Sequence, residues 1–411
     1  MNQIVFLFVD LAIVLVVARV LGALAKKIDQ PAVIGEVLAG ILLGPTLLGE
    51  GISEVVFPAE VRPFLTALAS VGVAVFMFGV GAELDRGTLR GKGRVATTVS
   101  LTSIAAPFAL GSGLALYLAV NHEVQNRLAF VLFIGAAMSV TAFPVLARIL
   151  SDRGMSRTAV GGIALTCAAV DDLLAWCLLA VVVVVSGGGA AQWLIALSPV
   201  YLAVMLWVVR PLLRRVFTPD RPAGTVLPVL LAGLLVSGAV TELIGLHFIF
   251  GAFFFGLVVP HRGTAALRGV VLERMGEFNA ALLLPVFFIV AGLKVDLSSL
   301  GSTDLVELLL VLLVAVGGKF GGAYLAARLN RLPVRQSAAL GVLMNTRGLT
   351  ELIILSVGLQ LGVLDQSLYS IMVVMAVITT AMAGPLLRII YPASAVDHDL
   401  DVERARQRTA P

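Results

Sequence analysis

The sequence predicts an all-α polytopic membrane protein with about 13 transmembrane helices. Three observations predict this class: 59% of the 411 residues are apolar, only 13% are charged, and apolar runs of spanning length recur along the whole chain. Soluble domains carry about 25% charged residues. No soluble fold of this size could bury so much apolar surface, so lipid must solvate much of the chain.

The expected spans follow from the apolar runs, taken in chain order. They lie at about 4–25, 32–48, 62–84, 96–119, 128–150, 157–185, 192–213, 225–243, 246–260, 277–296, 304–327, 336–360 and 368–391. The first run has no basic segment before it, which argues against a cleavable signal peptide, and it ends at Lys26-Lys27. The ninth run is short, and only a tight turn near Gly245 separates it from the eighth.

Basic residues orient these spans. Of the 29 Lys and Arg residues, 23 fall in alternate loops and in the C-terminal tail, which share one side of the membrane. Three fall on the opposite side and three within spans: Arg62, Arg127 and Lys294, then Arg19, Lys319 and Arg347. Because cytoplasmic loops are enriched in Lys and Arg, we expect a multi-pass protein of the plasma membrane with its N-terminus outside and its C-terminus in the cytoplasm.

This orientation predicts the internal organisation. An odd number of spans lets two six-helix halves of inverted topology be joined by the seventh span, a common plan in transporters. We expect one transmembrane domain over residues 1–391 and a short, disordered cytoplasmic tail over 392–411. The chain has no phosphate-binding loop and no dinucleotide fingerprint, so we expect neither a nucleotide cofactor nor nucleic acid as a partner.

Two adjacent acids, Asp171-Asp172, lie near the centre of the sixth span. A charge there costs about 2.5–3.5 kcal/mol on insertion scales, so it needs a partner or a water-filled cavity. Adjacent side chains on a helix point about 100° apart, so the two carboxylates face different neighbours and have different roles. A carboxylate that titrates near the working pH can hold a proton or a cation. The structural alternative is a capping or interhelix hydrogen bond.

Lys319 is the lysine that falls inside a span, in Val316-Gly317-Gly318-Lys319-Phe320-Gly321-Gly322. The flanking glycines allow a close approach of another helix. A partner carboxylate would keep the ammonium charged in the bilayer. The alternative is that the side chain reaches the interface, although about eight residues separate it from the cytoplasmic end of the span.

Two spans contain polar interruptions. In the fifth, Thr141-Ala142-Phe143-Pro144 includes a proline that removes a backbone donor, which indicates either a kink or an unwound stretch whose carbonyls line an ion site. In the twelfth, Arg347 and Glu351 are spaced i,i+4 on one helix face, as an ion pair or as part of a site. These spans correspond to each other under the inverted plan, and paired interruptions of this kind point to a binding site.

Other ionisable residues receive less weight. Asp10, Glu36 and Glu242 could lie in a dimer interface or a cavity, and we expect Glu83, Glu277, Asp296 and Glu307 to lie near membrane edges. The four histidines, among them His122 and His247, are scattered and show no metal-binding spacing. Cys167 and Cys177 lie about 15 Å apart along one helix, too far for a disulfide.

Together these motifs resemble the monovalent cation:proton antiporter-2 family. The resemblance rests on residues 30–45 (QPAVIGEVLAGILLGP), Thr141–Val145, Asp171-Asp172 and Asn345–Leu349, and it spans the whole chain. It implies a transporter and not an enzyme. It also implies a homodimer with dimerisation helices at about 1–84 and 192–296, and core helices at about 96–185 and 304–391 that contain two crossed, broken helices.

The resemblance also implies roles for the site residues. Asp172 would carry the cation and the proton, Asp171 would pair with Lys319, and the core would move against the dimerisation helices in an elevator-like cycle. We expect Thr141 to help Asp172 hold the cation. An Asp-Asp pair with the lysine is typical of electrogenic members that exchange Na⁺ or Li⁺ for H⁺ and serve pH homeostasis. A K⁺/H⁺ antiporter of the same family remains the alternative.

Three other classes compete with this interpretation. An ion channel would need a continuous pore, and a sodium:solute symporter could share inverted repeats. An intramembrane aspartyl protease would need two carboxylates that share one site. Adjacent residues on one helix cannot converge in that way, so this class ranks last.

Overall fold

The computed structural model describes residues 3–83, 94–156, 158–186, 194, 197–218, 221–260, 264–298, 300–397 and 399, and within these ranges it is helical without a strand. The first part of the chain forms α1 (Gln3–Lys27), α2 (Ala32–Leu43), α3 (Pro45–Val56), α4 (Arg62–Glu83), α5 (Arg94–Leu118), α6 (Arg127–Ser139), α7 (Phe143–Asp152) and α8 (Ala159–Ser186).

The middle part forms α10 (Ser198–Val204), η1 (Met205–Val209), α11 (Arg210–Val216), α12 (Ala223–Leu243), α13 (Phe248–Leu257), α14 (Ala265–Phe278), η2 (Asn279–Leu283) and α15 (Leu284–Leu293). The last part forms α16 (Ser302–Leu329), α17 (Val334–Met344), α18 (Leu349–Gln360) and α19 (Gln366–Ile390). The prediction of an all-helical membrane protein is confirmed.

The described helices of spanning length are fewer than the thirteen predicted spans. Within the described ranges nine helices are long and apolar enough to cross a bilayer, or ten if α17 and α18 count as one bent span. The expected spans at 32–48 and 246–260 contain shorter apolar helices, α2 and α13, and 192–213 lies partly outside the described residues. The count of thirteen is therefore not confirmed.

One expected boundary was wrong. The sequence indicated a span that starts near residue 277, whereas α14 begins at Ala265 and runs on through η2 and α15 to Leu293. Arg268, Glu273 and Arg274 therefore lie on a helix and not in a loop. The charged residues of α14 give this exposed helix the composition of a loop. The apolar run alone therefore placed the start of the helix too late in the sequence.

Contacts divide the chain into two compact units. Unit 1 comprises Met1–Val16, Ser53–Arg90 and Val183–Val290, and unit 2 comprises Val17–Ile52, Gly91–Val182 and Ala291–Pro411. Within the described helices the chain passes from one unit to the other in α1, α3, α8 and α15. The expected grouping into dimerisation and core helices stays a prediction. The expected disorder of 392–411 falls largely on residues outside the described ranges.

Unit 1 is built around close helix contacts at glycines. A Cβ at Gly81 of α4 would lie 2.2 Å from the Phe253 carbonyl oxygen of α13, and one at Gly256 would lie 2.2 Å from the Phe78 carbonyl oxygen. The two helices therefore touch backbone to backbone. The π-helical segments η1 and η2 each end shortly before a proline, Pro211 or Pro285, which cannot donate the next helical hydrogen bond.

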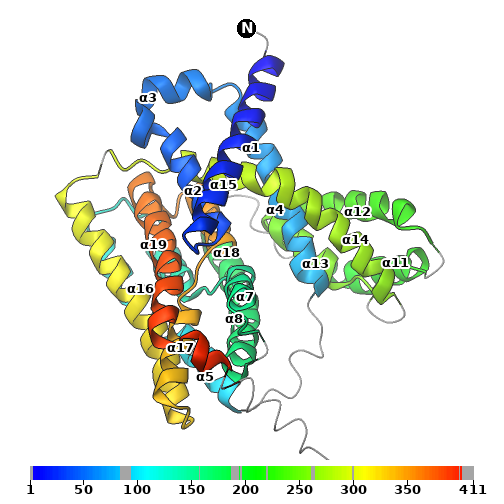
Figure 1. Ribbon diagram of the computed structural model, residues 1–411. Coiled ribbons are helices and arrows are strands. Elements are labelled where there is room, and N and C mark those ends of the chain that lie inside the picture. The colour runs from blue at the N-terminus through cyan, green and yellow to red at the C-terminus, as the bar shows by residue number, and fades with distance from the viewer. Residues whose placement is uncertain are drawn as a thin grey trace, which may run out of the picture. The chain divides into compact units, whose positions relative to one another are not determined.

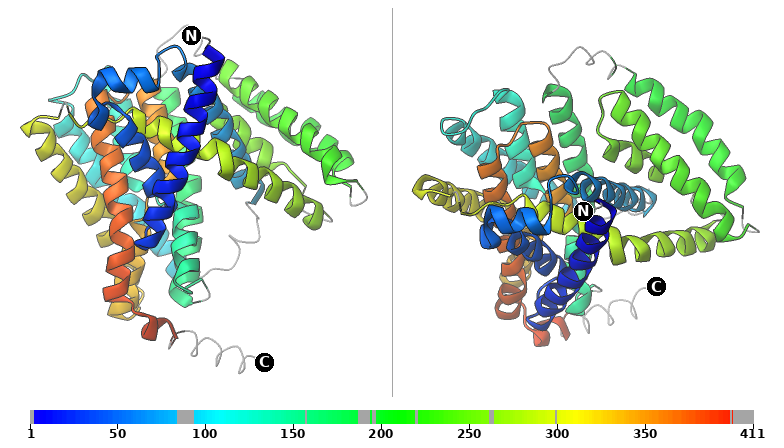
Figure 2. Two further views of the ribbon diagram at one scale, coloured as in Figure 1. Left: turned by 45° about the horizontal axis from the view of Figure 1, so that its top comes forward. Right: turned by 90° about the horizontal axis from the view of Figure 1, so that it is seen from above.

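Unit 2 is a bundle in which α5, α16, α17 and α19 pack against one another or against shared neighbours. Figure 1 and Figure 2 show α16 and α19 side by side, in yellow and orange. Its apolar core joins side chains from α7, α16, α17 and α19, among them Leu146, Leu150, Ala323, Leu340 and Leu387. This bundle holds the two interrupted helices.

Both predicted interruptions are real breaks. Residues Val140 and Ala142 have extended backbone between α6 and α7, and Pro144 stands in the first turn of α7, where its missing N–H costs no helical hydrogen bond. In the other break, α17 ends at Met344 and α18 begins at Leu349, with a bend of 40°. Each break leaves two half-helices with free ends inside the bundle.

Candidate cation and proton site

The two breaks meet each other inside unit 2. The Ala142 N–H of the first donates to the Thr346 carbonyl of the second at 3.0 Å. A Cβ on Gly348 would come within 2.5 Å of the Val145 side chain, so glycine allows the backbone of the second break to pass against α7. Unwound backbone in a membrane helix needs such partners, and here each break supplies them to the other.

Arg347 satisfies the free end of α6. Its guanidinium donates to the carbonyls of Ala137 and Met138 at 2.8 and 2.9 Å, and it pairs with Glu351 at 2.6 Å. Both charged side chains are fully buried. Because the C-terminal end of a helix carries partial negative charge, the guanidinium compensates it while Glu351 balances the guanidinium. The predicted Arg347–Glu351 contact therefore forms a locally neutral support at the crossing.

Asp171 is the more fully bonded of the two adjacent acids. Its Oδ2 accepts from the Lys319 ammonium at 2.7 Å and from the Thr141 hydroxyl at 2.8 Å, and its Oδ1 accepts from the Ser100 hydroxyl at 3.3 Å. The Lys319 and Asp171 side chains are both 0% exposed. A buried carboxylate with a cation and hydroxyl donors is held as an anion whose charge is neutralised locally.

Glycines place Lys319 opposite Asp171. A Cβ at Gly318 would lie 2.8 Å from Pro107 Cα, and one at Gly322 would lie 2.7 Å from the Thr102 carbonyl oxygen, both on α5. Gly317 and Gly321 face open space instead. One face of the glycine-rich stretch therefore packs directly on α5, which also supplies Ser100 to the same carboxylate.

Asp172 has a different environment, as expected from its 100° offset. The residue is 6% exposed, and its Oδ2 accepts from the Phe143 N–H at the start of α7 at 3.4 Å. The Thr350 hydroxyl, in the first turn of α18, also hydrogen-bonds this carboxylate. The Asp172 Oδ1 atom is buried and has no hydrogen-bond partner among the described residues.

The surroundings of Asp172 leave room for one positive charge, at its unpartnered Oδ1 atom. The N-terminal ends of α7 and α18 both carry partial positive charge toward the carboxylate, which stabilises the anion. The bare oxygen is an acceptor that a proton or a metal cation can satisfy. The two adjacent acids therefore differ: one is already neutralised by the protein, and the other has capacity for a cation.

One predicted contact has a different geometry. Thr141 was expected to help Asp172 hold a cation, but its hydroxyl is hydrogen-bonded to Asp171 and to the Met344 carbonyl. A contact between Thr141 and a cation at Asp172 stays a prediction. Pro144 lies in the first turn of α7, next to Phe143, whose N–H reaches Asp172.

Sequence reasoning missed Ser100 and the specific part played by Thr350. Ser100 belongs to a short polar group with Thr102 and Ser103 in an otherwise apolar span, which was the available signal. The Asn345 side-chain oxygen is also buried without a partner among the described residues. The second break and α5 thus contribute polar groups that spacing alone did not assign.

A second ionic cluster lies at one end of unit 2 and was not anticipated. His122, in the turn after α5, contacts Glu307 of α16 at 2.8 Å and Asp365, the N-cap of α19, at 2.5 Å. The hydrogen bond to Asp365 is the main cause that raises the pKa of His122 to about 9. Glu307, expected at a membrane edge, is 1% exposed and also accepts from Asn121 at 2.7 Å. We call this cluster the His122 clamp.

Asp10 and Glu242, two acids for which the sequence allowed a place in a dimer interface or a cavity, differ in burial and hydrogen bonding. Asp10 is fully buried, and neither carboxylate oxygen has a hydrogen-bond partner among the described residues. Glu242 is exposed and accepts from the Phe248 N–H at 2.7 Å, so it caps the start of α13.

Known proteins resemble this chain along its length. Residues 12–391 match the family described as "Sodium/hydrogen exchanger, transmembrane". The Na(+)/H(+) antiporter NhaS4 of Synechocystis sp. is 39% identical over 96% of this chain and 99% of its own length. The K(+)/H(+) antiporter 1 of Saccharomyces cerevisiae is 31% identical over 95% of this chain.

The relatives differ in length. This chain spans 47% of the yeast protein and 48% of the Cation/H(+) antiporter 15 of Arabidopsis thaliana, which is 36% identical to it. The solved structure of the sodium proton antiporter MjNhaP1 from Methanocaldococcus jannaschii matches with a TM-score of 0.66, at 16% identity, over 98% of this chain and 100% of that chain. The latter likeness establishes the fold.

Profile, relatives and fold therefore agree with the resemblance inferred from the motifs. Cation/proton exchange is the shared description of the matched relatives, whose family consists of transporters and not of enzymes. The chain belongs to the transmembrane sodium/hydrogen exchanger family of cation/proton antiporters.

Proposed function

We propose that this protein exchanges Na⁺ or Li⁺ for H⁺ across the membrane and that Asp172 carries both ions. The observation that carries the proposal is the contrast between neighbours: Asp171 is paired with Lys319, while Asp172 keeps a buried oxygen without a partner among the described residues. A carboxylate of this kind binds one positive charge at a time. Competition between H⁺ and Na⁺ for it couples the two flows.

The cycle needs Asp172 to face each side in turn. On the side of higher pH it releases its proton and takes Na⁺, with help from Thr141, Thr350 and carbonyls freed by the two breaks. On the other side a proton displaces the cation. Arrival of Na⁺ also weakens the Lys319–Asp171 contact and releases a second proton, which makes the exchange electrogenic.

The wider architecture belongs to the same proposal. Helices at about 96–185 and 304–391 form a mobile core, and those at about 1–84 and 192–296 form the interface of a homodimer. The core carries Asp172 across the membrane in an elevator-like movement. The N-terminus is outside and the C-terminus cytoplasmic in the plasma membrane, as the basic residues indicate.

A K⁺/H⁺ antiporter is the second candidate. It is favoured by the similarity to a yeast relative named for K⁺, whereas the relative of nearly equal length is named for Na⁺. The agreement in length and the higher identity of the latter support Na⁺. Exchange in proteoliposomes with Na⁺, Li⁺ and K⁺ in turn, with and without a clamped potential, separates the two candidates and tests electrogenicity.

Asp172→Asn tests the carrier itself. The amide cannot take up a proton in exchange for a cation, so we expect exchange to fall to background for every cation. Glu273→Gln removes an exposed acid on α14 and should leave exchange unchanged. If Asp172→Asn vesicles retain exchange above background, Asp172 is not the carrier.

A further inference from the structure

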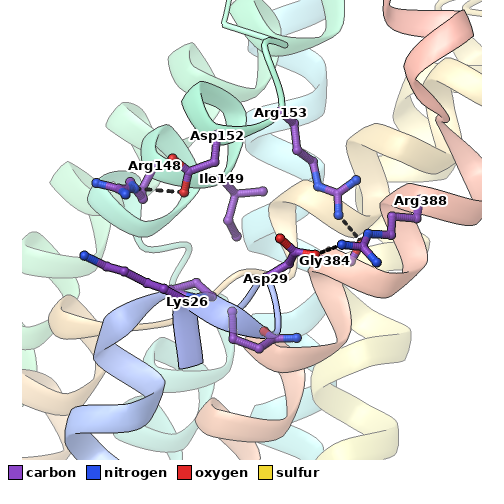
Figure 3. Close-up of a pocket in the computed structure, with 10 residues that line it drawn as sticks. Lys26, Asp29, Arg148, Ile149, Asp152, Arg153, Gly384 and Arg388 are labelled. Atoms are coloured by element: carbon purple, nitrogen blue, oxygen red, sulfur yellow. Dashed lines mark hydrogen bonds and ion pairs between the residues drawn. The ribbon is translucent and has the colours of Figure 1, made fainter. Parts of the chain in front are cut away.

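Unit 2 contains a pocket of about 400 Å³ whose lining does not include the residues of the two helix breaks. The turn between α1 and α2, the last turn of α7 and the last turns of α19 line it (Figure 3). Its charged lining comprises four cations and two acids: Lys26, Arg148, Arg153, Arg388, Asp29 and Asp152.

Two of the four cations are already paired. Arg148 contacts Asp152 at 2.8 Å, one turn further along α7, and Arg388 of α19 contacts Asp29. Figure 3 shows the two pairs on different sides of the pocket. These pairs neutralise both acids of the lining. The two cations that remain give the pocket a surplus of positive charge.

The remaining cations are Lys26 and Arg153. In the described part of the chain neither forms an ion pair with a carboxylate within 4.0 Å. The Arg153 guanidinium donates to the Gly384 carbonyl at 2.7 Å, and burial lowers the pKa of Arg153 because desolvation disfavours its charged form. A partly desolvated cation bonded to a neutral carbonyl is stabilised further by an anion.

The frame of the pocket is fixed by backbone contacts. Gln30 N–H donates to the Ala25 carbonyl, and its side-chain amide donates to the Ala381 carbonyl at 3.0 Å. A Cβ on Gly384 would lie 3.2 Å from the Asp29 carbonyl oxygen and 3.8 Å from Arg153 Nη2. Glycine therefore lets the turn and the guanidinium approach the same point of α19.

We propose that this pocket binds a phosphate-bearing anion held by Lys26 and Arg153, which links the α1–α2 turn to α7 and α19. Guanidinium and ammonium groups are the protein groups that bind phosphate oxygens best, the first through its fork of N–H donors and the second as a point charge. The two positive charges of Lys26 and Arg153 match the charge of a phosphate dianion. They also suit a phospholipid headgroup, whose phosphodiester carries one negative charge and which offers a further hydrogen-bond acceptor.

The ligand has two sources with the same chemistry. Lys26 and Lys27 lie in the last turn of α1, at the expected membrane boundary, where the headgroup of an anionic phospholipid would reach the pocket. A free phosphate or phosphate ester from solution would bind the same donors. An ordinary rim of solvated basic residues is the competing explanation, and it predicts no saturable binding.

The test uses the full-length protein purified in detergent. Thermal unfolding is followed while inorganic phosphate replaces chloride at constant ionic strength, and lipid retention is measured by native mass spectrometry after exposure to phosphatidylglycerol or phosphatidylcholine vesicles. We expect a saturable rise of the unfolding midpoint with phosphate, or selective retention of phosphatidylglycerol. The first result assigns a soluble anion and the second a lipid headgroup.

Variants locate the binding. Lys26→Gln with Arg153→Gln should weaken binding about tenfold for each charged hydrogen bond lost. The control, Arg214→Gln with Arg215→Gln in the last turn of α11, removes equal charge from unit 1 and should bind normally. Lys26→Gln alone removes an exposed side chain and provides a variant that keeps the fold if the double variant does not.

The proposal is overturned if the wild type shows neither a saturable phosphate effect nor preference for the anionic lipid. It is equally overturned if the control variant loses as much affinity as the pocket variants do, because total charge would then explain the binding. Loss confined to the Lys26 and Arg153 variants supports it. None of these readouts depends on transport, so failure of the proposed exchange activity is a separate result.

Discussion

Lys319 and Asp171 are coupled because each is the other's main compensation. Both side chains are 0% exposed and 2.7 Å apart, and the carboxylate has two further hydroxyl donors on Thr141 and Ser100. The ammonium has Asp171 as its recorded acceptor. Removing the lysine leaves a buried carboxylate with hydroxyl donors alone, and removing the acid leaves a buried ammonium.

Lys319→Ala should therefore lower the unfolding free energy by about 3–5 kcal/mol, the usual cost of breaking a buried pair. Replacing both partners, as Asp171→Asn with Lys319→Met, should cost less because no lone charge remains. Thermal or denaturant unfolding in detergent measures both. Equal losses for the single and double variants would mean that the ion pair is not what stabilises this position.

Cation/proton exchange by the Lys319→Ala protein tests whether the lysine also takes part in transport. If the lysine contributes a proton to each cycle, the charge moved per cation in vesicles should decrease, and the pH dependence should shift. Ser100→Ala leaves the lysine in place and is the control for disturbing Asp171. An unchanged charge per cation in Lys319→Ala vesicles would remove the lysine from the proton count.

The sequence predicted which residues form the site, but it predicted their hydrogen-bond and ion-pair partners only in part. A buried charge must have a partner, so the sequence indicated a carboxylate for Lys319, and the offset of adjacent helical residues indicated distinct roles for Asp171 and Asp172. Ser100 was missed because serine and threonine hydroxyls in a helix often bond the backbone of their own helix, as those of Thr102 and Ser103 do. The hydrogen bond from Thr141 to Asp171 was not predicted, because spacing does not say which of two adjacent carboxylates a hydroxyl meets.

At the scale of elements, the packing of α16 on α5 depends on which glycines face inward. Gly318→Ala would place a Cβ 2.8 Å from Pro107 Cα, whereas a Cβ at Gly317 meets nothing within 4 Å. We expect Gly318→Ala to destabilise the protein by about 1–3 kcal/mol, as overpacking usually does. Gly317→Ala should be neutral or stabilising, because alanine has the higher helix propensity.

Thermal unfolding of the two variants side by side tests this assignment, and exchange activity gives a second readout. Because Lys319 follows Gly318 directly, the packing error should also reduce exchange in Gly318→Ala and spare it in Gly317→Ala. Similar behaviour of the two variants would contradict the close contact. The sequence predicted that these glycines allow helix contact but not which of them face α5.

The His122 clamp joins three elements and responds to pH. The pKa of His122 is raised to about 9, so the stability from its charged form is fully present below about 6.5, the ordinary histidine value, and is lost as pH rises through about 9. Burial alone would raise the pKa of Asp365, but hydrogen bonds from His122 and the Leu368 backbone outweigh it and lower the pKa. Asp304 nearby on α16 accepts from Ser367.

His122→Gln should therefore unfold at a lower temperature than the wild type near pH 7, and the difference should shrink as the pH rises past about 9. Glu123→Gln alters the exposed neighbour and should follow the wild type at every pH. Unfolding midpoints between pH 6 and 10 measure this. A difference that does not depend on pH would show that the imidazole charge contributes nothing to the clamp.

For the whole molecule, composition and charge asymmetry predicted the class, and motif order predicted the family. The breaks after Ser139 and Met344 were predicted because proline and dense polar residues are incompatible with a continuous apolar helix. The count of thirteen spans is not confirmed, because the apolar runs at 32–48 and 246–260 contain the short helices α2 and α13. The His122 clamp joins residues 185 and 243 positions apart, which no local pattern reveals.

The anion pocket gives a prediction at this scale that rests on the proposed exchange. Lys26 lies in the segment predicted to form dimerisation helices and Arg153 in the predicted core segment, although both belong to unit 2. If these segments move against each other in the proposed exchange, a bound phosphate would restrain that movement. Lys26→Gln with Arg153→Gln should speed exchange in phosphatidylglycerol vesicles relative to wild type and change little in phosphatidylcholine. Equal rates in phosphatidylglycerol would mean that the anion does not act as a brake.

The crossing of the two breaks has a consequence for the work done against an electric field. With its side chains ionised, the Arg347–Glu351 pair and the Lys319–Asp171 pair each sum to zero, so a single uncompensated negative charge remains on Asp172. With a proton bound at Asp172 the assembly is neutral, whereas in the proposed exchange the loss of a second proton from Lys319 leaves the Na⁺-loaded assembly with one negative charge, which makes the exchange electrogenic. When empty it carries one charge, which lipid opposes by several kcal/mol. In the proposed exchange, an empty return would therefore meet more electrostatic resistance than a proton-loaded return, which would limit the loss of the ion gradient through futile cycles.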